Sequence, residues 1–594
     1  MAGSRLWRAA ELGFAALTVG YHLWLAFASL IPNLVSRPLH LALLLPWIFL
    51  FAPQPRPAGR WFGWVVGGLG LAASLYVVWS RERLDEQYGI LEGWLQYAVA
   101  AVLILCVLEA ARRAVRWALP LVAVLALAYG LFGWAIPGAF GHPGLPLASL
   151  LGNLTIAESG LWGPLTGISA NIVAVFVILG ALLAAGEAGE GFMGLALRLA
   201  GRLRGGAAKV AVVASALFGS LSGSASANVA STGAVTLPMM RRLGYPPPLA
   251  AAVEAVASTG GQIMPPLMGA GAFVMVELLR EPYARIMEAA LLPALLFFLA
   301  CWLAIDGAAR RLGLKPVERE ALPPLPHLAR TLPFFLVPAA LLLWLLLARG
   351  YTPQRAAAWT ALLALALLLL DRGLRPALRP FLHRLGAALV AASRQMATIG
   401  AVIICAGIVI GVLNLTGLGV KLTAAILDLS GGSLAPALAL TALACLVLGM
   451  EVPTTAAYVI AVSVAGPALQ ELGLPPLLAH FFVFWYALLS TITPPVCGTV
   501  FIAAGMAEAR WLETALYALL LGVGLYLVPI GFVVEPALLA PLGEPLWALL
   551  GFFKIALSLA LVAAAGNRLA ETPLKALVLA AVAFGLLLWP LAPA

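Results

Sequence analysis

The chain has 594 residues, of which 63% are hydrophobic and only 10% are charged. An average soluble domain carries about 25% charged residues, so a soluble protein of this composition would expose far too much apolar surface. The same apolar content excludes a disordered chain. Because one spanning helix needs about 20 apolar residues, the composition and the mean hydropathy of +1.02 predict an all-α polytopic membrane protein.

Along the chain we expect about 15 transmembrane crossings plus two re-entrant hairpins. The crossings are predicted at residues 11–31, 38–52, 61–79, 93–111, 115–136, 162–186, 247–278, 286–309, 331–348, 356–370, 396–416, 477–505, 512–534, 546–566 and 574–590. Two of them, 247–278 and 477–505, are long and are interrupted by Gly and Pro-Pro. Two further apolar stretches, 207–238 and 434–472, are rich in Gly, Ser, Thr and Pro at their middles, which predicts hairpins that enter and leave on one side.

The basic residues predict which side each loop occupies. With the N-terminus placed in the cytoplasm, the inside segments hold most of the 35 Lys and Arg residues. Lys209, Arg241 and Arg242 then flank the first hairpin on the same side. We therefore interpret the net charge of +10 as a topology signal and not as a nucleic-acid-binding surface. The first apolar run is long for a cleaved signal peptide, which favours an uncleaved anchor.

Two stretches match at a constant offset of 229 residues, as from Pro238 to Pro467. The matches are dominated by Gly and Pro, and they include the Pro-Pro pairs at 265–266 and 494–495. An odd number of predicted crossings, five, runs from the first broken span to the second hairpin, so the second unit is predicted to be inverted. Each unit is a hairpin followed by a broken helix, and two inverted units make a site that is reachable alternately from each side.

The first unit places small oxygen ligands at its tip, residues 219–228, and at its break, residues 258–266. Proline removes a backbone donor and glycine permits unwinding, so carbonyl groups are freed at the break. Helix packing by small residues is the alternative interpretation of the tip. We assign to the substrate Ser222, Ser224, Asn228 and Gln262, and to a coupling ion Ser220, Thr259, Gly261 and Met264.

The second unit repeats this pattern at its tip, residues 449–458, and its break, residues 490–499. Polar oxygen ligands recur at the equivalent place, which favours a shared binding site. We assign to the substrate Thr454 and Thr455, and to the coupling ion Gly449, Ser490, Thr491 and Thr493.

Two acidic residues lie within apolar stretches. Glu254 comes about two helical turns before the first break, and Glu451 lies in the second tip with no basic residue nearby in the sequence. A carboxylate inside the membrane is costly and is therefore a functional candidate by default. Both are predicted to serve the coupling ion, either by carrying a proton or by balancing a cation. Pairing with the N–H groups of a helix end is another interpretation of each. For Glu254, a place near the cytoplasmic surface is the alternative.

The remaining motifs do not indicate catalysis. The six histidines are scattered, the five cysteines form no CxxC pair, and HExxH, GxGD and GxSxG are absent from the sequence. The chain also lacks GxxxxGK[ST], so it does not hydrolyse ATP itself. We predict no enzyme activity, no cofactor and no metal beyond a possible bound Na⁺, with H⁺ as the other coupling ion.

Several segments resemble the membrane subunit of TRAP (tripartite ATP-independent periplasmic) transporters. They are Phe218–Gly233, Arg242–Pro246, Ala252–Pro266, Gly449–Thr455 and Thr493–Pro495. The chain is most similar to the TAXI branch, in which the small and large membrane subunits are fused. The resemblance implies a four-helix stator region like the small subunit at 1–115, a transport region like the large subunit at 116–545, and a C-terminal two-helix extension at 546–594.

The resemblance further implies an elevator mechanism in the cytoplasmic (inner) membrane. A separate periplasmic binding protein would deliver a dicarboxylate or related organic acid, and Na⁺ or H⁺ would be co-transported. The lipid bilayer surrounds the protein, and no nucleic acid is expected as a partner. A stand-alone cation–carboxylate symporter without a binding protein is the alternative. The four N-terminal crossings argue against it, because they add a stator but no hairpin.

Overall fold

The computed structural model describes residues 2–28, 31–52, 57–266, 268–371, 373–450, 452–495, 497–568 and 572–591. Within these ranges every regular element is a helix, as the composition predicts. Nine of the described helices are long and apolar enough to cross a membrane, or ten if a bent pair is counted as one span. Shorter apolar helices occupy further predicted crossings, so the polytopic all-α class is confirmed. The total of about 15 crossings remains a prediction.

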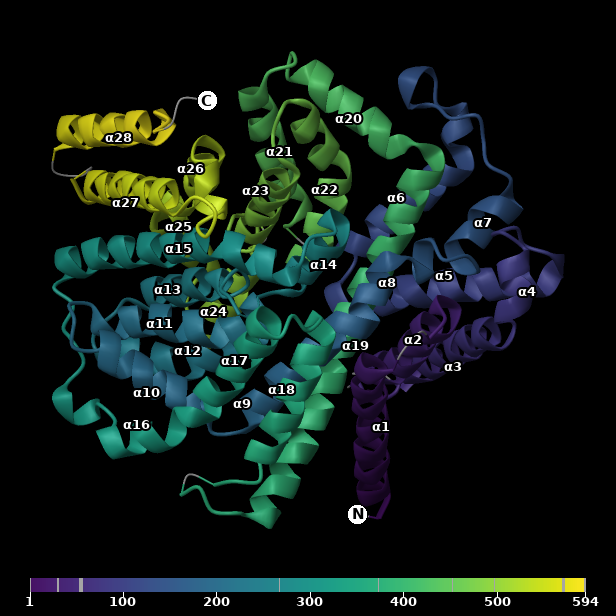
Figure 1. Ribbon diagram of the computed structural model, residues 1–594, viewed down its shortest axis with the longest axis horizontal. Coiled ribbons are helices and arrows are strands. Elements are labelled where there is room, and N and C mark those ends of the chain that lie inside the picture. Colours follow the sequence, from purple (N-terminus) through teal and green to yellow (C-terminus); the bar gives the residue numbers. More distant parts are fainter. Residues whose placement is uncertain are drawn as a thin grey trace.

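The N-terminal region packs on a long helix from the middle of the chain. Its helices are α1 (Ala2–Phe27), α2 (Asn33–Phe49), α3 (Pro57–Trp79), α4 (Arg81–Glu86) and α5 (Gly93–Val115). Three of them, α1, α2 and α5, lie against the 39-residue helix α19 (Leu378–Thr416). In Figure 1, α19 runs diagonally through the molecule with α1 to α5 on one side of it. The four long helices here correspond to the four crossings predicted for this region.

The segment between α5 and the first repeat unit is helical but interrupted. It contains α6 (Ala118–Phe132), α7 (Leu147–Thr155), α8 (Pro164–Ile168), α9 (Ala174–Ala185) and α10 (Ala188–Ala200). A π-helical turn at Ser169–Val173 joins α8 to α9, so the predicted crossing at 162–186 is one bulged span. Such π-bulges displace side chains from the regular helical register.

The connection between the two units is more helical than predicted. It contains α15 (Tyr283–Leu312), α16 (Leu325–Thr331), α17 (Pro333–Leu343), α18 (Pro353–Leu367), α19 and α20 (Leu418–Leu429). The crossing predicted at 396–416 is only the second half of α19. Five α-helices of the chain, α4, α7, α10, α16 and α20, lie almost wholly outside the predicted segments. They are short, and α10 and α20 are amphipathic segments that a search for continuous apolar runs does not detect.

The two repeat units fold into equivalent helices. The first unit is α11 (Gly206–Ser222), α12 (Ala225–Arg242), α13 (Pro247–Gly260) and α14 (Ala270–Leu279). The second unit is α21 (Leu434–Leu448), α22 (Thr454–Glu471), α23 (Pro476–Leu489) and α24 (Gly498–Met506). Both ends of α12 and α13 recur in α22 and α23 at the offset of 229. Gly244 and Gly473, at matching turns, both adopt positive φ, and both Pro-Pro bonds are cis.

The C-terminal helices pack on the side of the molecule opposite to α1. They are α25 (Trp511–Gly522), α26 (Val528–Val534), α27 (Pro545–Arg568) and α28 (Pro573–Leu588). The pair α27–α28 lies beside α15 and α26, as Figure 1 shows. The buried Lys554 ammonium lies 2.5 Å from the carboxylate of Glu535 and 2.6 Å from the carbonyl of Trp589. The ion pair joins α27 to the segment that precedes it, and the bond to the Trp589 carbonyl joins α27 to the residue that follows α28.

A buried polar chain connects α1 and α2 to the π-helical turn. His22 Nδ1 lies 2.7 Å from the Thr18 carbonyl, His22 Nε2 lies 2.7 Å from His40 Nδ1, and His40 Nε2 lies 2.9 Å from Ser169 Oγ. Because a carbonyl only accepts, neutral rings require His22 to donate to Thr18, His40 to donate to His22, and Ser169 to donate to His40. The sequence did not indicate this pairing, because the two histidines are 18 residues apart on different helices.

Replacing His40 by phenylalanine should destabilise the protein. The change leaves His22 Nε2 and Ser169 Oγ buried without their partner, which costs about 1–3 kcal/mol for each unsatisfied group. We expect a lower midpoint of thermal unfolding for the purified protein in detergent. His383→Phe is the control, because His383 is exposed on α19. Equal midpoints for the two variants would show that the polar chain contributes nothing to stability.

Candidate functional site

The helix α13 ends in a tightened turn at the first Pro-Pro pair. The N–H groups of Gly261, Gln262, Ile263 and Met264 each donate to the carbonyl three residues earlier, in place of the four-residue spacing of an α-helix. The Gln262 carbonyl then accepts the N–H of Gly269, at 2.7 Å, where α14 begins. Proline cannot donate, so the carbonyl groups that precede it lack their helical partners. The predicted break is therefore present.

The helix α23 ends in the same way. The N–H groups of Thr491, Ile492 and Thr493 donate to the carbonyls three residues earlier. The Thr491 carbonyl accepts both the N–H and the hydroxyl of Thr499, at 3.2 and 2.6 Å. The Thr493 hydroxyl lies 2.6 Å from the Tyr526 hydroxyl, a contact that the sequence did not predict. The two breaks thus share the tightened turn, but the N–H donor to the Thr491 carbonyl lies one residue later than the repeat predicts from Gly269.

Each tip lies in close contact with the break of its own unit. A Cβ atom added at Gly261 would collide with the Cα of Gly219 and lie 2.7 Å from Asn228 Nδ2. In the second unit, a Cβ atom added at Gly449 would collide with Ser490 Oγ. Gly261 and Ser490 are related by the offset of 229. Glycine is required at the first position because the two backbones touch there.

The predicted ligands of the first tip lie in different surroundings. The Ser224 hydroxyl accepts the N–H of Ala227, at 3.4 Å, and so caps α12. The Ser220 hydroxyl donates to the Leu217 carbonyl, at 2.7 Å. Asn228 is fully buried, and its amide donates to the carbonyls of Ser215 and Ser258, at 2.9 and 3.2 Å. The structure therefore places Asn228 between α11 and α13, where it holds the tip against the break.

The second tip is described less completely. Gly449 follows α21, and Thr454 and Thr455 form the first turn of α22, with Thr454 buried. Glu451 lies outside the described residues, as does the side chain of Ser222 in the first tip. The Ser490 hydroxyl donates to the Ala487 carbonyl at 2.6 Å.

The two units meet at their breaks. The Thr259 hydroxyl of α13 lies 3.3 Å from the Thr491 hydroxyl after α23. Helices of one unit also pack against helices of the other. In the first unit, α12 packs against α24 of the second unit and α14 packs against α22 of the second unit. These two contacts are equivalent under the repeat. The structure therefore brings Thr259 and Thr491 together, although they are 232 residues apart.

Glu254 lies on α13, two turns before the break, and is fully buried. Its carboxylate accepts short hydrogen bonds from the hydroxyls of Thr232 and Thr236 on α12, and one of 3.2 Å from Ser258. The sequence singled out Glu254 but missed these three hydroxyls. The available signal was the four-residue spacing of Thr232 and Thr236, which places both on one face of a helix.

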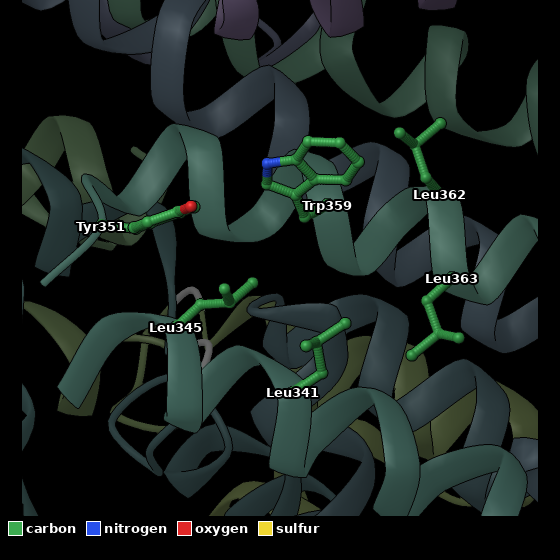
Figure 2. Close-up of a pocket in the computed structure, with 6 residues that line it drawn as sticks. All are labelled: Leu341, Leu345, Tyr351, Trp359, Leu362 and Leu363. Carbon is green, nitrogen blue, oxygen red and sulfur yellow. The ribbon is translucent and has the colours of Figure 1, made fainter. Parts of the chain in front are cut away.

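Two cavities lie away from the tips. One, of about 470 Å³, is lined by apolar and aromatic residues of the α17–α18 hairpin, with Trp359 and Tyr351 at its edge (Figure 2). The other, of about 240 Å³, is lined by residues around Glu158 and Asn414, the latter at the end of α19. Neither is lined by a predicted site residue.

Comparison with known proteins shows the family of this chain. Residues 102–540 match the family described as "Tripartite ATP-independent periplasmic transporter, DctM component". The chain belongs to this family. The match includes both repeat units, and together with the apolar helices it places the chain among multi-pass membrane proteins. Residues 1–101 lie outside it.

Individual relatives match this chain at low identity and over part of its length. The protein y4mL of Sinorhizobium fredii is 31% identical over 199 residues, which are 33% of this chain and 46% of that protein. The C4-dicarboxylate TRAP transporter large permease protein DctM of Pseudomonas aeruginosa is 30% identical over 186 residues, 31% and 43% of the two chains. The isethionate TRAP transporter permease protein DctMQ of Oleidesulfovibrio alaskensis is 26% identical over 345 residues, 56% and 52%. The matches thus span about half the length of these relatives.

Proposed function

We propose that this DctM-family permease imports a small organic acid across the inner membrane, driven by a co-transported cation. The observation that carries the proposal is the meeting of the two repeat units at Thr259 and Thr491, 3.3 Å apart. Hydroxyls and freed carbonyls at two adjacent breaks are ligands suited to a small cation. Helix N-termini at the tips, such as that of α12 behind Ser224, present N–H groups to a carboxylate.

The substrates named for two relatives support the substrate class. C4-dicarboxylate and isethionate, named for the Pseudomonas and Oleidesulfovibrio permeases, are both small organic anions. We infer a dicarboxylate or related carboxylate for this chain. Transport would follow an elevator motion in which the two units, inverted relative to each other, move as one body. A periplasmic binding protein would deliver the substrate.

We also propose that the chain is a fused permease of the TAXI type. Residues 1–101 fall outside the family match yet form helices that pack on α19, as expected of a small subunit joined to a large one. In this arrangement α1 to α5 belong to the stator. The N-terminus would lie in the cytoplasm, as the basic residues predict.

Uptake into proteoliposomes tests the proposal. Labelled 2-oxoglutarate and succinate would be offered with the binding protein encoded nearest this gene, under a Na⁺ gradient and under a pH gradient in turn. We expect uptake that needs both the binding protein and one gradient, and none in liposomes without the permease. Uptake without the binding protein would favour the stand-alone symporter. No uptake of any small carboxylate under either gradient would contradict the proposed function.

A further inference from the structure

The buried carboxylate of Glu254 has three hydroxyl partners and, among the residues that the structure describes, no cationic partner. Thr232 and Thr236 approach it from α12, and Ser258 approaches from its own helix. All of these side chains are fully or almost fully buried. Three hydroxyl donors lower the cost of burying a carboxylate but do not neutralise its charge. The charge of the carboxylate therefore still has to be balanced, either by a proton or by a cation.

Two basic residues on the surrounding helices pair with carboxylates other than Glu254. Lys209 on α11 binds Asp306 of α15 at 2.6 Å, and Arg241 on α12 lies 3.8 Å from Glu508. The titratable and charged groups on the helices packed against α13 are Lys209 on α11, Arg241 and Arg242 on α12, Tyr283, Arg285, Glu288, Cys301, Asp306, Arg310 and Arg311 on α15, and Glu513 and Tyr517 on α25. Within the described residues, none of them forms an ion pair or hydrogen bond with Glu254.

The hydroxyls around Glu254 can serve either state of the carboxyl group. Thr232 Oγ1 also lies 2.7 Å from the Asn228 carbonyl, and Thr236 Oγ1 lies 3.0 Å from the Thr232 carbonyl. A hydroxyl has one proton, so each threonine donates either to the carboxylate or to its own helix. When Glu254 is protonated, it donates to a threonine hydroxyl, which turns to the backbone carbonyl. No donor is left unpaired in either state.

This change of the hydrogen-bond acceptor affects the contact between the tip and the break of the first unit. The backbone carbonyl of Asn228 competes with Glu254 for the Thr232 hydroxyl. The side-chain amide of Asn228 donates to the backbone carbonyls of Ser215 on α11 and Ser258 on α13. The same amide lies against Gly219 and Gly261, where the tip touches the break. A proton arriving at Glu254 therefore changes a hydrogen bond one helical turn from the tip contact.

We propose that Glu254 binds the coupling proton, and that its protonation is transmitted through Thr232 and Asn228 to the first tip. The inference rests on the proposed function, since it names the ion of that transport cycle. In one direction of the cycle a proton from water forms the O–H bond of the carboxyl group. On the other side of the membrane the same bond breaks and the proton returns to water.

Infrared difference spectroscopy on the full chain in lipid tests proton binding without any substrate. At neutral pH exposed carboxyl groups are ionised, so a persistent C=O band of a protonated carboxyl group reports a buried acid. We expect the wild type to show this band and Glu254→Gln to lack it. Glu471→Gln, at an exposed site at the end of α22, is the matched control and should keep it. Glu254→Asp retains a carboxyl group and should move the band rather than remove it.

The opposite results overturn the proposal. An unchanged band in Glu254→Gln would show that Glu254 holds no proton. Loss of the wild-type band on adding Na⁺ at fixed pH would show that sodium occupies the site instead. Both readouts are independent of transport, so a failure of the proposed function would not imitate them.

Transport then tests the role of the bound proton. Because Gln resembles the protonated acid, Glu254→Gln should retain exchange of labelled for unlabelled 2-oxoglutarate but lose accumulation driven by a pH gradient. A merely structural role would reduce both. Accumulation by Glu254→Gln at the wild-type level under a pH gradient would overturn the assignment.

Discussion

Uptake should fall at least about tenfold when Gly261 is replaced by alanine. The added methyl group would collide with the backbone of Gly219 and approach Asn228 Nδ2 to 2.7 Å. Backbone cannot move aside as a flexible side chain can, and overpacking of this kind costs about 1–3 kcal/mol. A cost of about 1.4 kcal/mol in the transport-competent state already corresponds to a tenfold loss. The measurement is the initial rate of uptake per amount of reconstituted protein.

The matched control is Gly505→Ala in α24. A Cβ atom at Gly505 would meet nothing within 4 Å, so the same chemical change is made without a collision. We expect wild-type uptake from this variant. Elution as one species in size-exclusion chromatography would show that Gly261→Ala still folds. Equal rates for the two variants would mean that the close approach of tip and break does not matter for transport.

Removing either hydroxyl at the junction of the two units should lower uptake by about tenfold, the equivalent of about 1.4 kcal/mol. Thr259→Val and Thr491→Val keep the side-chain shape but delete the two oxygen atoms that lie 3.3 Å apart. If both oxygens serve one site, the double variant should lose little more than either single variant. Initial uptake rates of the four proteins give this comparison.

Thr360→Val controls for the loss of a buried hydroxyl. Thr360 lies in α18, and its hydroxyl donates to the Ala356 carbonyl of the same helix, at 2.8 Å. Thr259 likewise donates to its own helix, so the control removes the same kind of bond outside the two units. Losses that simply add in the double variant would show that Thr259 and Thr491 act at separate places.

The repeat is carried by residues that shape the backbone. The Gly and Pro residues that recur at the offset of 229 are the residues that end helices and form turns. They consequently determined the ends of α12, α13, α22 and α23. The long helix α19 was underestimated because its first half is polar enough to resemble a loop. Amphipathic α10 and α20 were missed for a related reason, since only one face of each is apolar.

The local chemistry of each segment was thus set by the sequence: where apolar spans lie, where proline and glycine interrupt them, and that Glu254 is a carboxylate within one. Which side chains meet was decided only by the tertiary structure. Thr259 and Thr491, His22 and His40, and Glu254 with Thr232 and Thr236 come from different helices. Helical periodicity places a residue on a face, but the partner of that face depends on how the helices cross, and crossing is determined by the packing of the whole bundle.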